Sequence, residues 1–189
     1  MKKVYLDFGG NKGQGLRSFI SSYNIDPKYW IVETFEPDPN CNIENHIEDL
    51  SYVKINNKAI WLYDGNVDFS QMIDNTEGSS VECLMSESAC SDVNSESFRK
   101  HDSIISVECL DISKILKKYK DFDFVLVKMD VEGSEFKLLR KIIDDGSIKF
   151  INHLYVEWHH KYVRGESSES VNYLKNKISE IGVKIYEWH

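Results

Sequence analysis

The chain begins with a short apolar strand that ends at a glycine cluster and leads directly into an amphipathic helix. Residues 4–8 (VYLDF) are the apolar run, and Leu16, Phe19, Ile20 and Tyr23 then recur at helical spacing. A glycine-rich turn from a buried strand into a helix is the start of a βαβ unit, and consecutive units of this kind build a parallel sheet. The opening of the sequence therefore predicts an α/β fold.

The rest of the sequence continues the alternation of strands and helices. Residues 58–69 contain two extended runs around Asp64-Gly65, a dipeptide that favours a tight turn, and predict a hairpin. Apolar periodicity fails between residues 70 and 103, which predicts a long, mobile loop that covers the active site. The pattern as a whole predicts a doubly wound, mostly parallel sheet with helices on both faces. Strands are expected at 30–36, 52–56, 104–109, 122–129, 150–158 and 183–189, and helices in the forties, over 112–119 and 134–145, and from Ser167 or Ser168 to Gly182.

Length and composition narrow the class of protein. A chain of 189 residues has the size of one domain, and 41% hydrophobic residues are sufficient for its core. The net charge of −8 and the scattered basic residues argue against binding of nucleic acid. Four cysteines without CxxC spacing fit a reducing compartment, no apolar run approaches the ~18 residues of a membrane span, and the N-terminus lacks a signal-peptide pattern. We therefore predict a single cytoplasmic domain over residues 1–189.

The loop after the first strand has the pattern acid-x-Gly-x-Asn-x-Gly, formed by Asp7, Gly9, Asn11 and Gly13. Glycines let the backbone approach a ligand closely, and the helix start offers unpaired N–H groups to a nucleotide-like ligand. The dinucleotide fingerprint GxGxxG is not matched, whereas this pattern is a form that loops binding S-adenosylmethionine (SAM) take. A glycine-rich turn without a ligand is the structural alternative. We assign these four residues and Gly10 to cofactor binding.

Glu36 ends the second strand, about 20 residues after the glycine loop. A carboxylate at this position of a doubly wound fold accepts both hydroxyls of an adenosine ribose, although a strand-end glutamate can also be simply solvated. The same charge would repel a ribose phosphate, which disfavours NADP. Glu36 and the adjacent Pro37 are therefore predicted to bind the cofactor, with NAD and an oxidoreductase activity as the alternative to SAM.

Four segments of the chain carry a resemblance to a known family. They are DFGGNKGQG, FEPDP at 35–39, NNKAIWLYDGNVDF at 56–69 and VLVKMDVEGSEFKLLR at 125–140, the last containing the distinctive string Lys128-x-Asp130-x-Glu132-Gly133-x-Glu135. With these segments the chain resembles the FkbM-type SAM-dependent methyltransferases. The resemblance implies the class I methyltransferase (Rossmann-like) fold, SAM as cofactor, and transfer of a methyl group to a hydroxyl of a carbohydrate or secondary-metabolite-like acceptor. The final hairpin of that fold is shortened here to one terminal strand.

Ionisable residues follow two neighbouring strands and are the candidates for catalysis. Asp130 and Glu132 follow one buried strand, and Glu157 and His159 follow the next. Methyl transfer requires an acceptor oxygen held in line and a group that removes its proton. His159, with an ordinary pKa near ~6.5, is the candidate base, and Asp130 or Glu157 would orient the hydroxyl or the imidazole.

Other interpretations of these four residues remain open. Asp130 could cap a helix, and His159 could belong to a solvated strand end. The same side chains could bind Mg²⁺, but no ligand spacing is diagnostic, so we predict no metal. A SAM-binding module without catalysis is a further alternative, which the two acids of the motif and Glu157 argue against.

Overall fold

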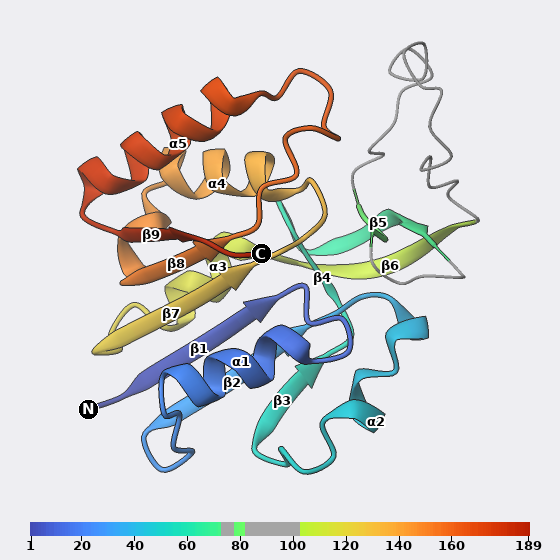
Figure 1. Ribbon diagram of the computed structural model, residues 1–189, viewed down its shortest axis with the longest axis vertical. Coiled ribbons are helices and arrows are strands. Elements are labelled where there is room, and N and C mark those ends of the chain that lie inside the picture. Colours follow the sequence, from blue (N-terminus) through green and yellow to red (C-terminus); the bar gives the residue numbers. More distant parts are fainter. Residues whose placement is uncertain (73–77, 82–102) are drawn as a thin grey trace.

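A six-stranded parallel sheet forms the centre of the computed structural model, which describes residues 1–72, 78–81 and 103–189 (Figure 1). Its strands are β1 (Lys3–Phe8), β2 (Trp30–Phe35), β3 (Val53–Asn56), β7 (Phe124–Met129), β8 (His153–Val156) and β9 (Lys184–Glu187). Their order is β3-β2-β1-β7-β8-β9, and each pairing among them is parallel. The predicted parallel sheet is thereby confirmed, and its last strand is the single terminal strand that the sequence indicates. The predicted covering loop falls largely on residues 73–77 and 82–102, which lie outside the described residues.

Helices cover both faces of this sheet, because alternate side chains of a strand point to opposite sides. The α-helices of the described chain are α1 (Gln14–Ser22), α2 (Ile43–His46), α3 (Ile112–Lys118), α4 (Glu135–Asp144) and α5 (Ser168–Ile181). Tyr5 and Leu126 pack in one buried cluster with residues of α1 and α2. Val4 and Val127 pack in a second cluster with residues of α3, α4 and α5. The doubly wound α/β fold predicted from the sequence is therefore confirmed.

A smaller, three-stranded sheet lies beside the main one (Figure 1). It consists of β4 (Ala59–Trp61), β5 (Gly65–Gln71) and β6 (Ser103–Asp111). The predicted hairpin over residues 58–69 is wrong, because β6 lies between β4 and β5 and pairs with both. The Asp64-Gly65 turn lies at the end of β6 instead, where the Asp64 carboxylate accepts a 2.7 Å hydrogen bond from the backbone N–H of Asp111. Residues of both sheets share one buried cluster, which supports a single domain.

The carboxyl ends of β1 and β7 meet where the chain changes its direction across the sheet. β1 has β2 on its other side, and β7 has β8. Open α/β sheets bind ligands at such a switch point. Gly9 follows β1 and Asp130 follows β7, and a Cβ added to Gly9 would lie 1.6 Å from the Asp130 carbonyl oxygen. Only glycine allows this approach, which brings the glycine loop and the acidic motif together.

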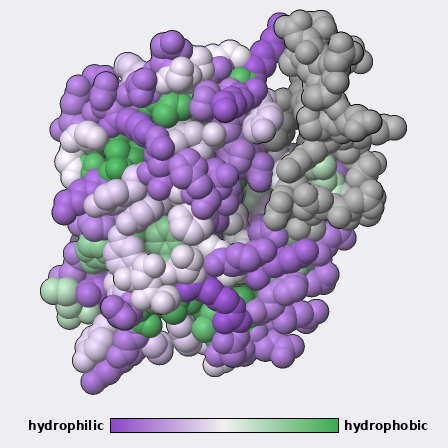
Figure 2. Space-filling view, in the orientation of Figure 1, coloured by the Kyte–Doolittle hydropathy of each residue, from purple (hydrophilic) through white to green (hydrophobic). Residues whose placement is uncertain are grey.

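Most of the surface seen in Figure 2 is formed by hydrophilic residues, with hydrophobic residues in small, separate patches. Within the described ranges, every helix is too short or too polar to cross a lipid bilayer. Cys41 and Cys109 are buried, as small apolar cysteines are expected to be, whereas Cys83 and Cys90 lie outside the described residues.

Gly13, the residue before α1, has a left-handed backbone conformation (φ +84°), and its added Cβ would lie 2.6 Å from Ile47 Cγ2. Gly13→Ala should therefore reduce the free energy of unfolding, measured in urea, by about 2–3 kcal/mol through backbone strain and overpacking. Gly146→Ala is the matched control, because Gly146 has φ +72° and no atom within 4 Å of an added Cβ. This control should cost only about 1–2 kcal/mol. Equal losses in the two variants would contradict the close packing against Ile47.

Candidate active site

The glycine loop is fixed to the neighbouring strand by backbone hydrogen bonds. The N–H groups of Gly9 and Gly10 donate to the Phe35 carbonyl oxygen at 3.0 and 3.1 Å. Gly10 has no room for a side chain, because an added Cβ would lie 2.3 Å from Thr34 Oγ1. That hydroxyl in turn donates a 2.9 Å hydrogen bond to Asp7 Oδ2. Asp7 is fully buried, and through Thr34 it supports the conformation of the glycine loop.

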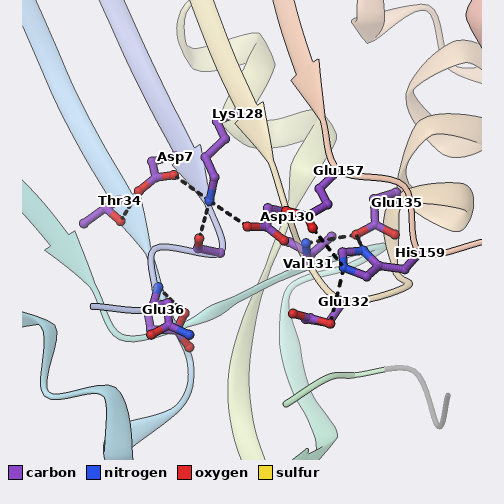
Figure 3. Close-up of polar contacts among 12 residues, drawn as sticks. Asp7, Thr34, Glu36, Lys128, Asp130, Val131, Glu132, Glu135, Glu157 and His159 are labelled. Atoms are coloured by element: carbon purple, nitrogen blue, oxygen red, sulfur yellow. Dashed lines mark hydrogen bonds and ion pairs between the residues drawn. The ribbon is translucent and has the colours of Figure 1, made fainter. Parts of the chain in front are cut away.

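Glu36 directly follows β2, and its carboxylate faces the glycine loop (Figure 3). Its Oε2 accepts a 2.8 Å hydrogen bond from Asn11 N, and its Oε1 accepts one of the same length from Asp38 N. The residue is only 8% exposed, so the alternative of a simply solvated glutamate is wrong. Burial raises the pKa of Glu36 to about 7, although the two backbone N–H groups oppose the shift.

Lys128 is a buried lysine that links the glycine loop to the acidic motif, and the sequence argument did not assign it a role. Its Nζ donates a 2.7 Å hydrogen bond to the Gly9 carbonyl oxygen and lies 3.4 Å from Asp7 Oδ1 and 3.2 Å from Asp130 Oδ2 (Figure 3). Burial lowers the pKa of Lys128, but the charges of Asp7 and Asp130 outweigh burial and raise it, so the ammonium stays charged. The sequence feature that could have identified this role is the presence of a lysine within an otherwise apolar central strand.

His159 lies at the centre of a group of carboxylates. Its Nδ1 lies 3.1 Å from Glu135 Oε1, and its Nε2 lies 3.4 Å from Glu132 Oε2 and 3.9 Å from Glu157 Oε1 (Figure 3). Glu135 is fully buried and also accepts hydrogen bonds from the backbone N–H groups of Val131 and Gly133. Glu135 therefore orients the imidazole and the turn that carries Glu132, a role that the sequence argument missed.

The protonation state of His159 differs from the one that the sequence predicts. Burial lowers the pKa of His159, but the hydrogen bond to Glu135 and the negative charges of Glu135, Glu132 and Asp130 raise it to about 9. His159 is therefore an imidazolium at neutral pH, not a group that titrates near its ordinary pKa. Burial raises the pKa of Glu132, and Asp130 and the other nearby carboxylates add to this effect while His159 opposes it. Burial and Asp130 likewise raise the pKa of Glu157.

One pocket joins the two motifs at the switch point of the sheet. Among the predicted site residues its walls include Gly9, Asn11, Glu36, Pro37, Asp130 and Glu132. The other predicted site residues do not line the pocket but support the residues that line it; they are Asp7, Gly10, Gly13, Glu157 and His159. The opposite wall has Ala59 and Phe69 from the smaller sheet, which the sequence did not identify. The cavity volume is about 60 Å³, below the 300–1,000 Å³ typical of ligand pockets, so a nucleoside cofactor must widen it.

Three side chains of this cluster are close enough to share a cation. One ligand atom each from Asp130, Glu132 and His159 lies within 4.8 Å of the others, which corresponds to the Mg²⁺ alternative considered from the sequence. A metal ligand must present an unprotonated nitrogen, whereas the surrounding carboxylates keep His159 protonated. A cation bound at this position would have to displace that proton.

Comparisons with known proteins show the family and the fold of the chain. Residues 7–180 match the family model of the methyltransferase FkbM domain. The crystal structure of methyltransferase FkbM from Methylobacillus flagellatus KT is similar in fold, with a TM-score of 0.51 at 14% sequence identity. The match covers 93% of this chain and 37% of that one, so the chain spans little more than a third of its length. No curated protein matches the sequence significantly. Because the family model covers most of its residues, the chain belongs to the methyltransferase FkbM domain family.

Proposed function

We propose that this domain transfers a methyl group from SAM to a hydroxyl of a carbohydrate or secondary-metabolite-like acceptor. The observation that carries the proposal is the shared pocket, in which Glu36 and the glycine loop lie next to Asp130 and Glu132. When bound, SAM supplies a methyl group that a hydroxyl oxygen can attack in line. The chain must then bind the nucleoside, orient the acceptor and take its proton.

The residues at the cofactor end fit an adenosine ribose. Each carboxylate oxygen of Glu36 accepts one backbone hydrogen bond, which leaves each oxygen one further acceptor site. Two neighbouring hydroxyls can donate to these two sites. Pro37 offers an apolar surface in the same pocket. Gly9 has no side chain, so its backbone is accessible to the cofactor at the pocket wall.

Glu132 is the residue best suited to take the proton of the acceptor. It lines the pocket, and its raised pKa makes it a stronger base than an ordinary glutamate. Asp130 also lines the pocket, but the ammonium of Lys128 lies 3.2 Å from its carboxylate, which favours a role in orienting the hydroxyl. The imidazolium of His159 lies 3.4 Å from the Glu132 carboxylate and holds it in place.

Calorimetry and a transfer assay test this proposal together. We expect S-adenosylhomocysteine (SAH) and SAM to bind with micromolar affinity, and NAD not to bind. With SAM labelled in its methyl group, we expect label on hydroxyl oxygens in a panel of glycans and polyhydroxylated metabolites. Binding of NAD without SAH would favour the oxidoreductase alternative, and binding of SAH without transfer to any acceptor would favour a module without catalysis.

Binding of SAH should weaken as the pH falls through about 7, the pKa to which burial raises Glu36. Only the ionised carboxylate accepts from both ribose hydroxyls, and between pH 8 and pH 6 its population falls about tenfold. Calorimetry should therefore show an affinity about tenfold lower at pH 6. Glu36→Gln should bind more weakly and lose this pH dependence. An affinity of the wild type that stays constant over this range would remove Glu36 from the ribose site.

A further inference from the structure

A second cavity lies on the smaller sheet, next to the pocket at the switch point. Its volume is about 340 Å³, within the range of small-molecule sites. Val81 lines both this cavity and the first pocket, so the two are adjacent. We name the cavity the sheet groove, and the argument rests on its residues Trp61, Tyr63, Asn66, Asp68, Ser106 and Lys137.

The sheet groove combines aromatic rings with short polar side chains. The Tyr63 ring is half-exposed and lies beside Gly65, where an added Cβ would be 3.7 Å from it. Trp61 is buried, with Lys137 Nζ 5.7 Å from the centre of its ring. Aromatic rings in this setting offer a rigid apolar face with little loss of conformational freedom on binding.

The polar side of the groove is built by the pairing of β5 with β6. Asp68 lies directly opposite Ser106 in the register of these strands. Asn66 Nδ2 donates a 3.4 Å hydrogen bond to Ser106 Oγ. Together these side chains present hydroxyl, amide and carboxylate groups, so the groove can both donate and accept hydrogen bonds.

This chemistry favours a neutral, polyhydroxylated ligand. A pyranose ring has an apolar face of C–H bonds that packs on an aromatic ring, and its hydroxyls each donate and accept one or more hydrogen bonds. A polyanion is disfavoured, because Asp68 in the groove offsets the positive charge of Lys137 and the chain carries a net charge of −8. A purely apolar ligand would make no use of the hydroxyl, amide and carboxylate groups of the groove.

We propose that the sheet groove binds a neutral sugar unit of the acceptor, adjacent to the unit whose hydroxyl lies beside Asp130 and Glu132. This inference rests on the proposed function and adds a class of substrate to it, namely a glycan of at least two sugar units. Val81 would lie at the junction between the two units. The groove then selects the acceptor, while the pocket at the switch point carries out the transfer.

A glycan array of neutral and anionic oligosaccharides, probed with the fluorescently labelled full chain with and without SAH, tests the proposal. We expect neutral oligosaccharides to bind. Tyr63→Ala should weaken this binding about 3- to 10-fold, the loss expected for one aromatic contact, and Asp68→Asn should also weaken it. Both variants should keep the SAH affinity of the wild type. Tyr29→Ala is the matched control, because Tyr29 is 50% exposed and precedes β2 at the opposite end of the sheet.

The outcomes separate the groove from the proposed function. Absence of glycan binding, selective binding of anionic glycans, or equal binding by Tyr63→Ala and Tyr29→Ala would overturn the groove even if SAH binds normally. Glycan binding that depends on Tyr63 in a chain that binds no SAH would support the groove and overturn the methyl transfer.

Discussion

Lys128→Met should reduce the free energy of unfolding by about 3–5 kcal/mol, the loss expected when one partner of a buried ion pair is removed. Lys128 is 3% exposed and contacts Asp7, which is fully buried. Burial already raises the pKa of Asp7, and the positive charge of Lys128 is the main effect that opposes the rise. Without Lys128 the Asp7 carboxylate must take up a proton or remain buried and unpaired. Urea denaturation of both proteins measures the loss.

The pH dependence and two controls make this prediction specific. Removal of Lys128 raises the pKa of Asp7 further in the folded state, so the destabilisation should shrink as the pH falls and the unfolded carboxyl also becomes protonated. Asp7→Asn in the Lys128→Met background should recover part of the loss. Lys54→Met removes one of the two lysine partners of another buried carboxylate, Glu33, which keeps Lys118. Because the Lys54 side chain is 58% exposed, its loss should cost at most about 1 kcal/mol. Similar losses in the two lysine variants would contradict a central role for Lys128.

Glu132→Gln should lower turnover by about 10²–10⁴-fold while it leaves SAM affinity nearly unchanged. The substitution preserves the shape of a residue that has a strained backbone (φ +50°) and removes its charge, and with it the ability to take a proton. In the wild type, the rate should fall on the acidic side of the pH profile at a pH above the ordinary pKa of glutamate, because burial raises the pKa of Glu132. This limb should be absent from the variant. Rates of label transfer from SAM to the acceptor identified by screening measure both effects.

Glu157→Gln provides the comparison for this result. Glu157 carries the same charge and also lies near His159, but it does not line the pocket. Its substitution should cost less than about tenfold in turnover. If both variants lose the same rate, or if Glu132→Gln loses less than about threefold, Glu132 is not the base and the cluster serves to hold the turn.

The sequence was most informative where one local pattern determines both an element and its position. The run from β1 through the glycine loop to α1 follows from apolar spacing and from glycines that the packing requires at Gly9 and Gly13. Ser167 and Gly182 mark the ends of α5 because one accepts a hydrogen bond from the first turn and the other has φ +97°. Asp130 and Glu36 were placed at one edge because parallel strands end at the same side of a sheet.

The errors came from interactions between segments that are distant in the sequence. A turn such as Asp64-Gly65 predicts that its flanking strands pair, but it does not reveal that β6 is inserted between them. The pKa of His159 depends on Glu135, Glu132 and Asp130, which belong to one segment that only the fold brings next to the histidine. The apolar run 122–129 was interpreted simply as a buried strand. The sequence argument therefore did not identify the ion pairs that Lys128 forms with Asp7 and Asp130.

The structure of the protein with bound SAH tests the central claim most directly. The account predicts SAH in the pocket at the switch point, with both ribose hydroxyls within about 3.5 Å of the Glu36 carboxylate and the sulfur directed toward Asp130 and Glu132. The cavity should be wider than in the ligand-free chain. SAH bound elsewhere, or bound in the pocket with its sulfur directed away from these two carboxylates, would contradict the account.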